Sequence, residues 1–208
     1  MLWVDILLMV VSGYAAFELI KFAQGRGRLK FLGLTVAAFI FTFMQATAVI
    51  GGFYATSAVT TVVGFILEWG HLICLAFILS ALAVFVRESK PVFAQFPLIY
   101  TALPLFIIIS YFFVYDSFVL KKWMFFLYQG GALLVSLMMY GLYSYRSRTY
   151  LIILAGIGLF LLCYILFWSF SAEARESLSW LWKLLLAGGI ATTILGYKYA
   201  HKKDEHVE

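Results

Sequence analysis

The sequence predicts an all-α integral membrane protein, a bundle of seven transmembrane helices, and three observations lead to this prediction. Hydrophobic residues make up 64% of the 208-residue chain and charged residues only 12%, against roughly 45–50% and about 25% in soluble domains. The apolar residues form long runs, and most basic residues gather in the short segments between them. This pattern is typical of helices that cross a lipid bilayer, which is therefore the first expected partner of the chain.

Seven apolar runs are long enough to be spans, since a transmembrane helix needs about 20 predominantly apolar residues. The predicted spans are residues 2–23, 31–53, 59–86, 97–115, 121–144, 149–170 and 178–199. They form one transmembrane domain over residues 1–200, and a short charged tail follows over residues 201–208. Because the connections are short, successive helices are expected to be antiparallel neighbours.

The distribution of basic residues predicts the orientation in the membrane. With seven antiparallel spans, 11 of the 15 Lys and Arg residues fall on the side of the C-terminus. The four on the opposite side are Lys121, Lys122, Arg175 and Lys183. The positive-inside rule then puts the N-terminus outside and the C-terminus in the cytoplasm, at the cell membrane. These charges act as topology signals, so nucleic acid is not an expected partner.

The third predicted span carries Glu68 and His71 well inside its apolar run. Ionisable residues are costly inside a membrane and usually serve a function. Three residues apart on a helix, the two side chains share a face and can touch. With the predicted topology, several other polar or aromatic residues fall in the same outer half of the membrane. We therefore predict an outward-facing ligand pocket lined by Glu68, His71, Gln45, Gln129, Lys183, Tyr164 and Trp168.

A structural interpretation of the same residues is a network of hydrogen bonds that holds the helices together, each bond contributing about 0.6 kcal/mol. A carboxylate and an imidazole are an expensive choice for that role, which favours the pocket. Lys183 has two options: it pairs with Glu68, or it extends toward the membrane surface.

No metal, cofactor or catalytic residues are predicted. A zinc site needs three or four ligands, and His71 is the one histidine within the predicted spans. Cys74 lies one turn after His71, but no group that would stabilise a reacting electrophile is evident nearby. Cys74 and Cys163 both lie in apolar runs and are expected to pack as small hydrophobic residues.

The sequence resembles microbial rhodopsins in a few residues: Glu68-Trp69 in the third span and Tyr164-x-x-x-Trp168 in the sixth. In that family the third helix carries an acidic residue beside a tryptophan, and the sixth lines an aromatic pocket. The resemblance also implies a retinal-binding lysine midway along the seventh helix. Here that region reads GGIATTILGY, and Lys183 lies too near the outer end. We therefore expect no retinal and assign no family.

Three functions remain open from the sequence. The first is a sensor or ligand-binding module that signals to, or assembles with, a membrane or cytoplasmic protein and binds a small molecule in the predicted pocket. The second is a small transporter or proton-coupled permease in which Glu68 and His71 are the titrating pair. The third is a structural subunit of a larger membrane complex.

Overall fold

The computed structural model describes residues 2–24, 28–54, 56–89 and 97–205, and all regular elements in these ranges are helices, as predicted. The α-helices are α1 (Leu2–Gln24), α2 (Arg28–Phe53), α3 (Ser57–Ser89), α4 (Pro97–Phe113), α5 (Phe118–Arg146), α6 (Leu151–Ser169), α7 (Ala172–Ser177) and α8 (Ser179–Glu205). A short 3₁₀ helix, η2 (Arg148–Tyr150), precedes α6. The predicted tail is helical as far as Glu205, because α8 continues into it. Residues 206–208 lie outside the described residues. So do Arg26 and Lys90, two of the basic residues on which the orientation prediction depends.

Six of the helices in the described part of the chain are long and apolar enough to cross a membrane. These are Leu2–Gln24, Phe31–Phe53, Ser57–Arg87, Phe118–Arg146, Arg148–Ser169 and Ser179–His201. They coincide with six of the seven predicted spans. The remaining one corresponds to α4, which has 17 residues, includes Pro104, and contains the shorter apolar helix Ala102–Phe113.

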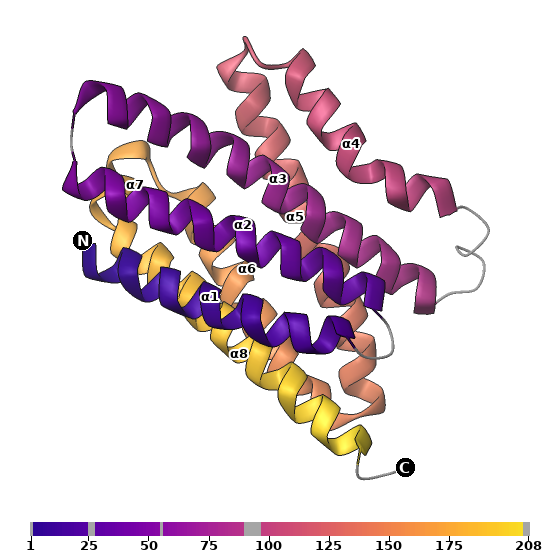
Figure 1. Cartoon of the computed structure of the whole chain (residues 1–208). Helices are drawn as coiled ribbons and strands as arrows, with labels where there is room; N and C mark the ends of the chain where they lie inside the picture. The colour runs from indigo at the N-terminus through magenta and orange to yellow at the C-terminus, as the bar shows by residue number, and fades with distance from the viewer. Residues whose placement is uncertain (1, 25–27, 55, 90–96, 206–208) are drawn as a thin grey trace. The chain divides into compact units, whose positions relative to one another are not determined.

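The described chain divides into two compact units, and α5 contributes residues to both. The N-terminal unit, Leu2–Ala132, contains α1 to α4 and the first half of α5. In it α1 packs on α2, α2 on α3, and α3 on α4. Figure 1 shows these helices running in alternating directions. The best-buried cluster of this unit joins α3 to α4 through Leu72, Ala76, Ile107 and Tyr111.

The C-terminal unit, Leu133–Glu208, is built on the contact between α6 and α8. Glycines set the distance between these two helices. A Cβ atom on Gly156 would lie 2.9 Å from the backbone nitrogen of Thr193 and 3.0 Å from the carbonyl oxygen of Gly189. One on Gly196 would lie 2.8 Å from the backbone nitrogen of Ile153. Small residues permit this close approach, which is how helices in lipid maximise van der Waals contact.

The Gly156→Ala variant is expected to unfold more readily than the wild type, by about 1–3 kcal/mol, because its methyl group forces α6 and α8 apart. Gly158→Ala is the matched control on the same helix, since nothing lies within 4 Å of a Cβ there. The measurement is the free energy of unfolding of each variant in the same detergent micelles. Equal stability of the two variants would show that the α6–α8 contact is not limited by Gly156.

Candidate functional site

Glu68 lies on the side of α3 that packs against α4. Leu72 and Ala76 follow it at intervals of four residues, which is one helical face, and both are fully buried. They pack against Ile107 and Tyr111 of α4. The Glu68 carboxylate therefore continues this buried face toward the N-terminal end of α3.

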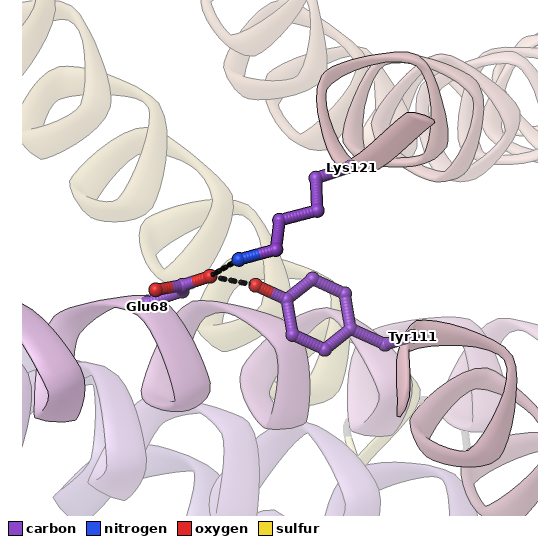
Figure 2. Close-up of polar contacts among 3 residues, drawn as sticks. All are labelled: Glu68, Tyr111 and Lys121. Atoms are coloured by element: carbon purple, nitrogen blue, oxygen red, sulfur yellow. Dashed lines mark hydrogen bonds and ion pairs between the residues drawn. The ribbon is translucent and has the colours of Figure 1, made fainter. Parts of the chain in front are cut away.

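Two side chains from other helices meet the Glu68 carboxylate (Figure 2). The Lys121 ammonium of α5 lies 2.7 Å from Oε1 of Glu68 and forms an ion pair with it. The Tyr111 hydroxyl of α4 donates a hydrogen bond to the same oxygen. The Glu68 side chain is still 35% exposed and that of Lys121 is 20% exposed, so this cluster lies at the edge of the unit and can be reached from outside it.

Two aromatic rings also lie near the Lys121 ammonium. Its Nζ atom lies 4.0 Å from the centre of the Tyr115 ring and 5.5 Å from that of Tyr111. Both distances are within the range of cation–π attraction. Trp69 stacks on Tyr115, with ring centres 6.2 Å apart, and meets Tyr111 edge to face at 5.3 Å. We call Glu68, Trp69, Tyr111 and Tyr115 the cage.

A tight turn between α4 and α5 brings Tyr111 and Lys121 to the same place. The backbone N–H groups of Val114 and Ser117 donate to the carbonyl oxygens of Tyr111 and Val114. Ser117 then starts α5, because its hydroxyl accepts from the N–H of Leu120 at 3.4 Å, the arrangement of an N-cap. Lys121 follows in the first turn of α5 and therefore lies next to the end of α4.

The chemistry of this arrangement is that of a balanced charge pair in apolar surroundings. A lone carboxylate inside a membrane helix is costly, and a hydrogen-bonded cation offsets much of that cost. Among the described residues, no three His, Cys, Asp or Glu side chains are grouped so that they could hold a metal ion. The groups that the cage presents are one carboxylate and three aromatic rings.

A separate hollow of about 330 Å³ lies between the C-terminal part of α2 and the N-terminal part of α3. Its lining is Thr47, Ile50, Ala58, Val59, Val62, Val63 and Ile66. Because Val59 and Ile66 project about half a turn away from Glu68 around α3, this apolar hollow is not part of the cage.

His71 does not join Glu68, although the sequence predicts that they can touch. The part of the chain that the structure describes contains no hydrogen bond between them; His71 is exposed, and its ring meets that of Phe41 on α2 at 6.4 Å. The reason is the geometry of the α-helix, in which each residue turns by about 100° around the axis. Three residues after Glu68, His71 therefore points roughly 60° to one side of it, and Leu72 lies on the other side. That rotation turns it toward α2, where Cys74 also donates to the Ala37 carbonyl at 3.4 Å.

The other predicted site residues lie on four helices. Gln45 of α2 is buried and Gln129 of α5 is partly buried, both in the N-terminal unit. Tyr164, Trp168 and Lys183 belong to the C-terminal unit. There Tyr164 and Trp168 contact each other, with ring centres 6.4 Å apart. Whether any of these residues binds a ligand stays a prediction.

Three residues of this cluster are not predicted from the sequence as site residues: Tyr111, Tyr115 and Lys121. Lys121 is 53 residues from Glu68, and its position at the end of a predicted span indicates only a topology signal. Tyr111 and Tyr115 are two of 13 tyrosines. A usable signal is the four-residue spacing of these two tyrosines, because the predicted span 97–115 would place both on one face of a helix.

Comparison with known proteins adds no relative: no protein-family model, curated protein or solved structure matches the chain.

Glu68→Gln and Lys121→Met are each expected to lower the free energy of unfolding by about 1–3 kcal/mol, because each leaves a charged or polar partner unpaired. The double variant is expected to cost less than the sum of the two single costs. Lys122→Met is the control, since Lys122 is exposed and adjacent. The measurement is unfolding in detergent by urea or heat. Strictly additive costs would mean that Glu68 and Lys121 do not interact.

Proposed function

We propose that this chain is a seven-span protein of the cell membrane that binds a small molecule at the cage and transmits binding to a membrane or cytoplasmic protein partner. The observation that carries the proposal is the Glu68 carboxylate, which is held by Lys121 and Tyr111 from two other helices and yet is one-third exposed. That exposure leaves one side of the charge pair open to a bound molecule.

Trp69 gives the proposal independent support. Its indole Nε1 atom is buried and has no hydrogen-bond partner among the described residues. A buried donor without an acceptor costs about 1–3 kcal/mol. A bound molecule with an acceptor group would satisfy it, and Trp69 is already part of the cage.

The proposal favours a sensor over a permease that uses Glu68 and His71 together. A titrating pair needs the two groups in contact or joined by a water molecule. His71 packs toward Phe41, and Glu68 is paired with Lys121.

Seven spans require α4 to cross the membrane, and the basic residues support this. At 17 residues the helix is about 26 Å long, close to the hydrocarbon thickness of about 30 Å. If α4 did not cross, Arg146 and Arg148 would lie on the opposite side from Arg87, against the positive-inside rule. The proposed orientation keeps the N-terminus outside and the C-terminus in the cytoplasm.

Cysteine labelling in intact cells tests this topology. In a background with Cys74 and Cys163 replaced by Ala, Ser57→Cys and Asp116→Cys are expected to react with a membrane-impermeant thiol reagent. Ser147→Cys should react only after the membrane is permeabilised, because the α5–α6 connection is cytoplasmic. Labelling of Ser57→Cys without Asp116→Cys would mean that α4 does not cross.

Native mass spectrometry of the gently solubilised protein tests ligand binding. The wild type and Lys122→Met are expected to carry the same bound small molecule, and Glu68→Gln is expected to lose it because the anionic group of the cage is gone. A wild-type protein with the bare polypeptide mass, or a molecule that stays bound to Glu68→Gln, would contradict the proposal. The bare mass, together with a protein that co-purifies in fixed ratio, would instead identify a structural subunit.

A further inference from the structure

The Lys121 ammonium occupies the place of a cationic ligand. It has an anion at 2.7 Å and two ring faces at 4.0 and 5.5 Å. A carboxylate combined with two or more aromatic rings is the arrangement by which proteins bind ammonium groups, including quaternary ones. The chain therefore contains an ammonium site whose present occupant is its own lysine.

The walls of this site do not depend on Lys121 for their position. Tyr111 is fully buried and is packed edge to face against Trp69 at 5.3 Å and Phe125 at 5.8 Å. Tyr115 is supported by the Trp69 ring, and the Tyr111 hydroxyl holds the Glu68 carboxylate. The site would keep its shape if the lysine left.

Lys121 is able to leave because its ammonium is carried on a flexible stem of four carbons. It lies in the first turn of α5, next to the α4–α5 turn. Tyr115 at that turn is 42% exposed, so the cage is accessible at the α4–α5 turn. From there a lysine side chain can extend to the membrane surface.

We infer that the cage binds an organic ammonium group, which displaces Lys121 from Glu68 and the two tyrosines. This inference rests on the proposed ligand-binding function and names its ligand class. The ammonium belongs either to a soluble amine or to a lipid headgroup, since both present the same chemistry to the cage. Lys121 acts as a tethered competitor that keeps the Glu68 charge balanced until the ligand arrives.

The test is rescue of a lysine-free cage by added ammonium ions. Lys121→Ala is titrated with n-butylammonium and with tetramethylammonium chloride, and its unfolding midpoint is measured in detergent at constant ionic strength. We expect a saturable rise in the midpoint, absent with n-butanol and absent in Lys121→Ala/Glu68→Gln. The wild type should need at least about tenfold more ammonium, because the lysine must first be displaced. Lys122→Ala is the matched control and should behave as the wild type.

Lys121→Met serves if the alanine variant does not fold, because methionine fills the space of the lysine stem. Stabilisation of Lys121→Ala or Lys121→Met no greater than that of Lys122→Ala would overturn the inference. So would a response that persists in the double variant with Glu68→Gln. A neutral or anionic molecule bound to the wild type and lost on Glu68→Gln would also overturn it, while leaving the proposed function intact.

Nanodiscs distinguish the two sources of the ammonium group. Lys121→Ala is reconstituted in phosphatidylcholine and in phosphatidylglycerol, and the unfolding midpoint is compared with that of Lys122→Ala in each. Stabilisation by phosphatidylcholine alone would assign the cage to a lipid headgroup. Stabilisation by soluble ammonium ions, equal in both lipids, would assign it to a soluble cation. No response in either arm would overturn the inference.

Discussion

The N-terminal unit depends on one electrostatic constraint, which is that a carboxylate in an apolar helix must have its charge balanced. Glu68 meets this requirement through Lys121 and Tyr111, which lie at the two ends of the α4–α5 turn. The α4–α5 turn is therefore attached to α3 by these polar contacts. In addition, Ile107 of α4 belongs to the same buried apolar cluster as Leu72 of α3. In lipid, where burying apolar surface contributes little to helix association, such polar contacts specify which helices pair.

The C-terminal unit achieves the same end by a different route. Its α6 and α8 approach closely because Gly156 and Gly196 leave room for the opposite backbone. The end of α5 is joined to α8 by a hydrogen bond between the hydroxyls of Tyr140 and Tyr197. The neighbours that limit these two glycines are Thr193, Gly189 and Ile153, none of which is ionisable. The concentration of charge in the cage is therefore not a general requirement of helix packing in this chain, which supports a role for it beyond packing.

Most of the fold could be predicted from the sequence, and half of the site could not. Helices in a membrane satisfy their backbone hydrogen bonds internally, so apolar runs alone locate them, and six of seven predicted spans match long apolar helices. Glu68 stands out because a charge interrupts such a run. Its partner does not, because Lys121 is 53 residues away and lies at a span end where lysine is common. The three-residue spacing predicts that His71 touches Glu68, yet the rotation of about 60° around α3 turns His71 toward Phe41.

An internal lysine in the cage has a consequence for how such a site would respond. If the site were vacant without ligand, Glu68 would carry an unbalanced charge, which is costly in apolar surroundings. With Lys121 in place the charge of Glu68 is balanced before the ligand arrives, and a cation binds only by exchange. The apparent affinity for the cation is therefore lowered according to the fraction of time that the lysine occupies the cage.

Exchange also frees the first turn of α5 from its ion pair. Because α5 continues without interruption from Phe118 to Arg146 and supplies Tyr140 to the C-terminal unit, one helix experiences both the exchange and the contact with α8. A ligand that replaced Lys121 would therefore change the restraint on a single helix whose far end lies, in the proposed topology, at the cytoplasmic side.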